Sequence, residues 1–176
     1  LIEVAKAQRS LDGTIVDPFT AWLVLRGLKT LPLRFQRQCA NAARIADHLN
    51  THHSVDQVHY PGVGRRDAAP EITTLERLYP HGDYGAMLSF EIAGALHDEP
   101  ARFLDALQLW GTATTLGDLE SLALIPAMTS HRKLPEERRT NMGIVPELVR
   151  LSVGIEDADD LIADLDHALA EVVEGR

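Results

Sequence analysis

The sequence has little cysteine, little positive charge and no long apolar run, and each shortage excludes a kind of site or protein. Cys39 is the only cysteine among 176 residues, so the chain can form neither an internal disulfide nor a CxxC metal site. We expect its thiol to be buried and structural rather than reactive. The eight histidines are spread along the chain, and we expect no metal site.

Positive charge is outnumbered, because 17 Lys and Arg residues face 26 Asp and Glu residues, which gives a net charge of −9. This balance opposes binding to nucleic acids and to anionic membranes. No apolar stretch approaches the roughly 20 residues of a membrane span, and no signal-peptide pattern opens the chain. We therefore expect a cytoplasmic protein without nucleic-acid or membrane partners.

What is present is the composition of a globular domain, with 45% hydrophobic and 24% charged residues. Helical and alternating patterns predict an α+β fold, in which one sheet of about four mainly antiparallel strands carries helices on one face. The chain starts at Leu1 without a capping residue, so we expect it to be a piece of a longer protein. The predicted strands are 54–60, 86–93, 111–116 and 148–154, and the predicted helices are 1–11, 17–27, 33–50, 98–110 and 157–173, with short helices near Pro70 and from Pro135.

Arg150 lies inside LVRLSVGIED, residues 148–157, which otherwise has the pattern of a buried strand. Strand alternation places Val149 and Leu151 on one face and Arg150 on the other. A buried guanidinium is costly unless it is paired. Arg150 therefore forms an ion pair within the chain, which the pattern alone favours, or it binds the carboxylate of a ligand, for which its planar fork is suited.

The stretch TTLGDLES, residues 114–121, is predicted to be a strand that runs into a glycine turn. Hydroxyl and backbone N–H groups in such a turn can hold an anion. The alternative is a plain junction between a strand and a turn, and the pattern by itself favours that alternative.

From about residue 12 to residue 170, the chain resembles the C-terminal part of the Cys/Met-metabolism enzymes that use pyridoxal phosphate. That family includes cystathionine γ-synthases, cystathionine γ-lyases and methionine γ-lyases. The resemblance rests on stretches that occur in this order: DPFTAWLVLRGLKTLPLR, NAARIADHL, VHYPGV, MLSF, TLGDLESLALIPAMTSH and MGIVPELVRLSVGIEDADDLIADLDHAL.

The resemblance implies roles for three residues. Arg150 matches the arginine that binds the α-carboxylate of the amino-acid substrate in this family. Thr115 matches a hydroxyl residue near that carboxylate, although the family has serine there, and Thr114 matches a position that influences side-chain choice. With this resemblance, carboxylate binding becomes the favoured interpretation of Arg150.

The resemblance also implies what the chain lacks. The cofactor lysine and the other cofactor-binding residues of the family lie upstream of the match, and none of the lysines Lys6, Lys29 and Lys133 is in the family's lysine motif. We therefore expect that this chain alone neither binds pyridoxal phosphate nor catalyses.

By resemblance, the chain is the small C-terminal domain of a fold-type I enzyme. Residues 1–33 would be helices that lead from a missing N-terminal large domain and expose apolar surface, and residues 34–176 would be the α+β domain. The complete enzyme would be a homotetrameric lyase or transferase of γ-elimination or γ-replacement type, acting in transsulfuration. The alternative is a free-standing α+β module with a regulatory role, which binds an amino acid.

Overall fold

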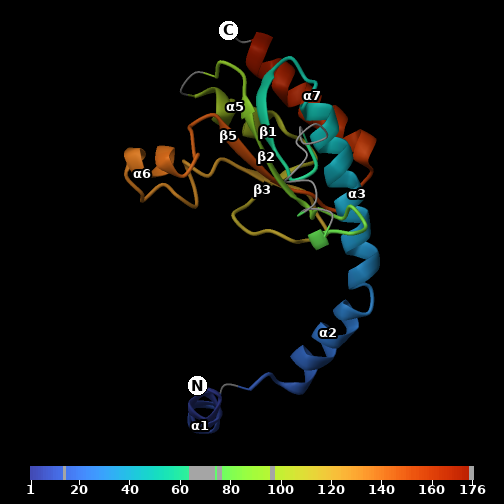
Figure 1. Cartoon of the computed structure of the whole chain (residues 1–176), viewed down its shortest axis with the longest axis vertical. Helices are drawn as coiled ribbons and strands as arrows, with labels where there is room; N and C mark the ends of the chain where they lie inside the picture. Colours follow the sequence, from blue (N-terminus) through green and yellow to red (C-terminus); the bar gives the residue numbers. More distant parts are fainter. Residues whose placement is uncertain (14, 64–73, 75–76, 96–97, 175–176) are drawn as a thin grey trace. The chain divides into compact units, whose positions relative to one another are not determined.

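The computed structural model describes residues 1–13, 15–63, 74, 77–95 and 98–174 (Figure 1). These residues fall into two compact units, Leu1–Leu33 and Arg34–Arg176. Their interpretation as domains of a larger fold stays a prediction. The short helix predicted near Pro70 lies outside the described residues. Within the described ranges, no helix is both long and apolar enough to cross a membrane.

The first unit contains α1 (Ile2–Asp12), α2 (Pro18–Leu28) and the start of α3 (Leu31–Leu49). The predicted start of α2 is confirmed, because the Asp17 carboxylate accepts hydrogen bonds from the N–H groups of Phe19 and Thr20 at 3.0 and 3.1 Å. These bonds satisfy two N–H groups that have no partner inside the helix, and Pro18 fits the first turn.

The second unit contains one five-stranded sheet with the strand order β1-β2-β5-β4-β3. All neighbouring strands are antiparallel except β3 and β4, which are parallel. The sheet has one strand more than the sequence predicted, because β4 is only three residues long and shows no alternation. The strands are β1 (Val55–His59), β2 (Met87–Ile92), β3 (Gly111–Thr112), β4 (Leu122–Leu124) and β5 (Leu148–Ser152).

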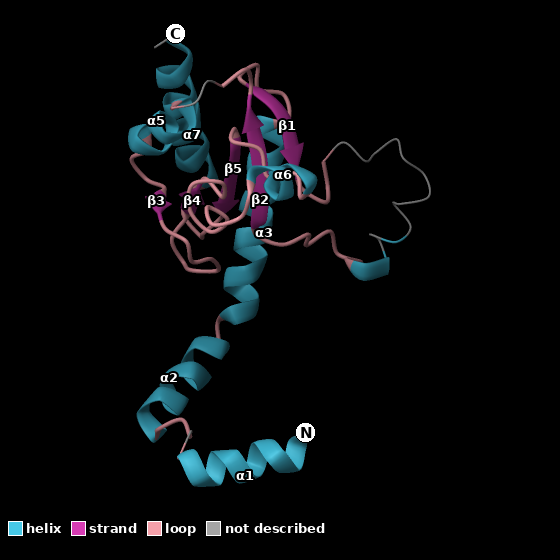
Figure 2. Ribbon diagram, turned by 90° about the vertical axis from the view of Figure 1, so that its left-hand side faces the viewer, coloured by secondary structure: helices cyan, strands magenta, loops and turns pink. Residues whose placement is uncertain are grey.

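Helices α3, α5 (Glu99–Ala106) and α7 (Ala158–Glu174) lie on one face of this sheet (Figures 1 and 2). The short α6 (Glu136–Asn141) lies on the other side and has no buried residue. The core fills the space between the sheet and the three helices. Its side chains from β2 and the β5 segment are Leu88, Phe90, Ile92, Val149, Leu151 and Val153. The alternate residues of β5 therefore point away from the core.

α5 is shorter than the predicted helix 98–110, because it ends at Ala106. Leu107 is extended, with φ −65° and ψ 137°, and the following residues run along α7 instead. Trp110 is buried there, and its Nε1 donates a hydrogen bond to the Leu161 carbonyl at 3.2 Å. Contacts with α7 thus replace the last helical turn.

Candidate functional site

Arg150 leaves β5 on the face opposite the core. Its neighbours across the sheet are Ser89 on β2 and Leu124 on β4. Val149 and Leu151, on either side of it, are fully buried in the core, so the predicted alternation is confirmed. β5 is flanked by a strand on both edges, and this central position fixes the backbone that carries Arg150.

The guanidinium of Arg150 is held by main-chain oxygens. Its Nη2 donates hydrogen bonds to the carbonyls of Thr114, at 3.3 Å, and Thr115, at 3.1 Å. Its Nε is the only buried side-chain nitrogen or oxygen without a hydrogen-bond partner in the part of the chain that the structure describes. A buried donor left unpaired costs about 1–3 kcal/mol.

The positive charge of Arg150 has no described counter-ion, since no ion pair joins it to a carboxylate of the residues in the described ranges. Partial burial lowers the pKa of the guanidinium, yet arginine remains charged at physiological pH. The internal ion pair that the pattern favoured is therefore not formed with a described residue. A half-buried cation held by neutral carbonyls is suited to an anion that comes from outside.

The structure brings Thr114 and Thr115 to Arg150 through their backbone carbonyls. Both side chains are exposed, and their hydroxyls make no hydrogen bond to Arg150 among the described contacts. Because each carbonyl accepts a hydrogen bond from the guanidinium, the two carbonyls fix the direction in which the remaining N–H groups of the guanidinium point. The direct role predicted for the Thr115 hydroxyl and the role of Thr114 in side-chain choice stay predictions.

A second set of contacts, which sequence reasoning missed, holds the far end of the 114–121 loop against β5. Glu156 accepts hydrogen bonds from the Ser121 N–H at 2.6 Å and from the Ser121 hydroxyl at 2.9 Å. The same hydroxyl oxygen accepts the Gly154 N–H at 2.8 Å. Earlier in the loop, the Gly117 N–H donates to the Ser152 hydroxyl at 3.0 Å. The loop and the strand that carries Arg150 are thus joined at two places.

Two buried amides of α3 extend this network. Asn41 donates to the carbonyls of Gly154 and Glu156 at 3.2 and 2.9 Å, and Gln38 donates to the Asp118 carbonyl at 2.6 Å. Asn41 begins the stretch NAARIADHL, and Gln38 lies one helical turn before it. In both places the sequence shows only a helical pattern. Polar residues on the buried face of a helix are the signal that could have found them.

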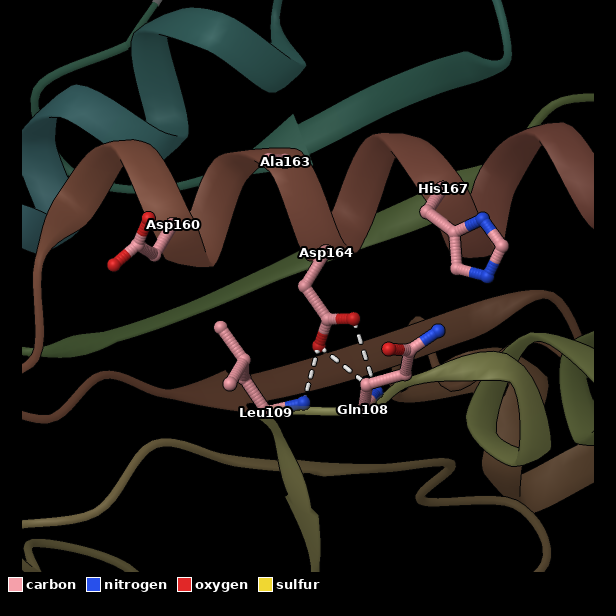
Figure 3. A pocket seen from close by; sticks show the side chains of 6 residues that line it. All are labelled: Gln108, Leu109, Asp160, Ala163, Asp164 and His167. Carbon is pink, nitrogen blue, oxygen red and sulfur yellow. Dashed lines mark hydrogen bonds between the residues drawn. The ribbon is translucent and has the colours of Figure 1, made fainter.

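A pocket lies between α7 and the segment that follows α5 (Figure 3). Asp164, which is 7% exposed, points into this space, and both its oxygens are engaged by backbone N–H groups. Figure 3 shows these bonds to Gln108 and Leu109. The carboxylate holds the chain in place there and leaves no unpaired oxygen for a ligand.

Three histidines and an aspartate meet where α3 ends beside α7. His48 and His52 lie four residues apart, and their Nε2 atoms are 2.6 and 3.7 Å from Asp166 Oδ1. The ring of His53 stacks on that of His52. No group of three or more His, Cys, Asp or Glu side chains within the described residues could hold a metal ion. These residues join α3 to α7.

The residues present do not fit a site for pyridoxal phosphate, the cofactor that the resemblance implies. A lysine that carries this cofactor must be held inside a pocket, but Lys6, Lys29 and Lys133 are all exposed. Lys6 pairs with Glu3 on its own helix. What the described residues do offer is the half-buried guanidinium of Arg150, with no described counter-ion and an unpaired Nε.

Comparison with known proteins identifies the family to which this chain belongs. Residues 2–170 match the family model described as "Cys/Met metabolism PLP-dependent enzyme". An O-acetyl-L-homoserine sulfhydrylase of Leptospira meyeri is 37% identical over 91% of the chain, and an L-methionine gamma-lyase of Pseudomonas putida is 42% identical over 92%. The chain spans 35% and 39%, respectively, of these two relatives.

A solved structure agrees with the sequence matches. The crystal structure of a cystathionine gamma-lyase from Lactobacillus plantarum, in complex with L-serine, superposes with a TM-score of 0.79 and 38% sequence identity. The match covers 93% of this chain and 41% of that one. At this identity the likeness extends beyond the fold, and the predicted α+β architecture of a fold-type I enzyme is confirmed.

Proposed function

Because the chain belongs to the Cys/Met metabolism family of pyridoxal-phosphate-dependent enzymes, we propose that it is the C-terminal domain that binds the substrate's α-carboxylate. The observation that carries this proposal is Arg150. Its guanidinium is half-buried on the open face of the sheet, without a described counter-ion, and with its Nε unpaired. A carboxylate supplies both the charge and the acceptors that the described residues do not.

The substrate class follows from what the relatives are named for. Their names refer to O-acetyl-L-homoserine, L-methionine and cystathionine. These are amino acids with a leaving group on the side chain and a free α-carboxylate, which fits γ-elimination or γ-replacement in sulfur amino-acid metabolism. Arg150 would bind the group that these substrates share, so it would position all of them without choosing between them.

The cofactor is assigned to no residue of this chain. We propose that a large N-terminal domain carries the cofactor lysine, since the chain spans about two fifths of its relatives and its own lysines are exposed. The complete enzyme would be a homo-oligomer, a tetramer by analogy with the family. In that assembly Arg150 and the 114–121 loop would hold one end of the substrate while the reacting end faces the other domain.

The test uses the product of the complete reading frame that encodes this chain. It is assayed with L-methionine, L-cystathionine, and O-acetyl-L-homoserine plus sulfide, as wild type, Arg150→Lys and Arg150→Ala. A charge-assisted hydrogen bond contributes about 1.5–3 kcal/mol, so KM should rise about 10- to 100-fold in Arg150→Ala. Arg150→Lys should restore only part of the affinity, because lysine keeps the charge but lacks the planar fork.

Arg132→Ala is the matched control, because Arg132 is exposed and its side chain makes no described hydrogen bond. It should leave KM unchanged. An Arg150→Ala enzyme with the wild-type KM would overturn the assignment. Binding of free amino acids through Arg150 by a product that turns over none of the substrates would favour the regulatory module instead.

A further inference from the structure

Two carboxylates, Asp164 and Glu156, hold the two ends of the segment whose middle contacts Arg150. We propose that both are positioning residues: they fix segment 108–121 so that the carbonyls of Thr114 and Thr115 orient the Arg150 guanidinium. This inference rests on the proposed function, since it concerns how the carboxylate anchor is aimed.

Asp164 fixes the first end of the segment. One of its oxygens accepts the Gln108 N–H at 2.9 Å, and the other accepts the N–H groups of Leu109 at 2.7 Å and Trp110 at 3.3 Å. Three consecutive N–H groups converge on one carboxylate of α7. These hydrogen bonds fix the position at which the chain enters β3, and β3 ends two residues before Thr114.

Glu156 fixes the second end. Its two oxygens receive the two donors of a single residue, Ser121, at 2.6 and 2.9 Å. The Ser121 hydroxyl in turn accepts the Gly154 N–H at 2.8 Å. Gly154 lies four residues after Arg150 on the same segment, so Glu156 connects the end of the loop to the strand that carries the guanidinium.

Neither carboxylate has a cation as a partner within the described residues, since both accept only N–H and O–H groups. Their contacts therefore define a geometry rather than neutralise a charge. The geometry matters for binding because the two loop carbonyls lie at 3.1 and 3.3 Å from Nη2. A misplacement of about 1 Å in a positioning contact can cost about 100-fold in rate.

The amide variants Glu156→Gln and Asp164→Asn test this directly. A carboxamide offers one oxygen where the carboxylate offers two, so one of the converging N–H or O–H donors would face an NH2 group. Asp160→Asn and Glu171→Gln are the matched controls, because both residues are exposed on α7 and their side chains make no described hydrogen bond. Ser121→Ala is a milder second variant that removes only the hydroxyl.

The first readout is the ratio of inhibition constants of L-norleucinamide and L-norleucine, with the complete enzyme. These two ligands differ only in the carboxylate, and neither has a leaving group on its side chain. We expect the preference for the acid to fall about tenfold in Glu156→Gln and Asp164→Asn, and to remain in both controls. In an Arg150→Ala background the same substitutions should cause no further fall, because their effect acts through the Arg150 guanidinium.

The second readout needs no activity. The NMR resonance of the Arg150 Nε–H group in the ligand-free protein should shift in Glu156→Gln, Asp164→Asn and Ser121→Ala, and stay in place in the controls. The inference is overturned if the resonance and the acid preference stay unchanged while only thermal stability falls. It is also overturned if Glu156→Gln and Asp164→Asn lower the acid preference further in an Arg150→Ala background.

The two proposals fail in different ways. If the wild type shows no preference for the acid, or if Arg150→Ala keeps the full wild-type preference, the proposed function is wrong. The Arg150 resonance then still decides whether the two carboxylates position its guanidinium.

Discussion

Gly154 lies where the chain leaving β5 passes very close to the 114–121 loop. A Cβ added there would overlap the Leu119 carbonyl and the Glu156 carboxylate, and would lie 2.8 Å from the Glu120 carbonyl carbon. Two of these three contacts are backbone atoms of a segment that is held by several hydrogen bonds. The close approach, rather than an unusual φ angle, therefore requires glycine at this position.

We predict that Gly154→Ala lowers the free energy of unfolding by about 1–3 kcal/mol, the usual effect of overpacking a tight site. Urea denaturation followed by circular dichroism measures it. Gly27→Ala is the control, because within the described residues no atom beyond its chain neighbours and its own helix backbone lies within 4 Å of a Cβ added there, and alanine favours a helix over glycine. An equally stable Gly154→Ala protein would show that the loop can move away from β5.

Cys39 gives a prediction about reactivity. Its side chain is 2% exposed in α3, and burial raises the pKa of its thiol. The thiolate is the reactive form, so both effects slow its modification. We predict that iodoacetamide alkylates the native protein much more slowly than the protein in urea, as measured by mass spectrometry. Equal rates in the two conditions would contradict the predicted structural role of this thiol.

For single residues, the sequence predicts which face of a strand a side chain occupies better than it predicts the hydrogen-bond partners of that side chain. Alternation placed Arg150 opposite Val149 and Leu151 because the side-chain period of a strand is fixed by its backbone. Its carbonyl partners lie 35 and 36 residues away along the chain. Every residue type has a carbonyl, so no sequence pattern marks which carbonyls will meet a guanidinium.

At the scale of the elements, the junction of α3 and α7 contains His52, a titratable residue whose pKa is lowered in the folded protein. The His52 Nδ1 accepts the Ser54 N–H at 3.2 Å, which requires an unprotonated Nδ1. Burial is the main cause that lowers the pKa of His52, and nearby His53 and His48 add to it, while Asp166 opposes it. The folded protein therefore favours neutral His52 more than the unfolded chain does.

This shift predicts a pH dependence of stability. With a lowered folded pKa, the contribution of neutral His52 is complete above the unfolded pKa of about 6.5, and it is lost as the pH falls through the folded pKa. His52→Asn keeps a side-chain acceptor for Ser54 without titrating. We expect the stability advantage of the wild type over His52→Asn to shrink as the pH falls from 7.5 to 5, in urea titrations. An advantage that grows at low pH would mean that Asp166 outweighs burial.

Helix starts and long helices could be predicted from local signals, whereas the end of α5 and the presence of β4 could not. Asp17 and Pro18 mark the start of α2 with groups that act within one turn. The end of α5 depends on Asp164, which lies 54 to 56 residues from the N–H groups that it binds. β4 forms because its three residues pair with β5, and a run of that length has no pattern of its own.

At the scale of the whole molecule, the two units differ in how they bury apolar side chains: the second unit has a core, whereas the first exposes many of its large apolar residues. α2 exposes large apolar side chains on several sides, among them Phe19 at 65% and Trp22 at 52%. A helix that is apolar all round is normally buried. A hollow beside it is lined by apolar and basic side chains, which are Trp22, Leu25, Arg26, Leu28 and Lys29. An exposed apolar surface of this kind marks an interaction site, which fits the large domain that we propose.

The last prediction concerns this surface when no large domain is present. The 19.4 kDa chain should elute above its monomer mass in size-exclusion chromatography with light scattering, because α2 would bury its apolar side chains against another copy. A variant with Leu23→Glu and Leu25→Glu should shift the mass toward the monomer, and a protein of residues 34–176 should be monomeric. The second unit contains the whole sheet and its core, so the shortened protein should keep a cooperative unfolding transition. A full chain that stays monomeric at about 100 μM, where weak apolar association would be detected, would show that α2 needs no partner, and would remove this support for the missing domain.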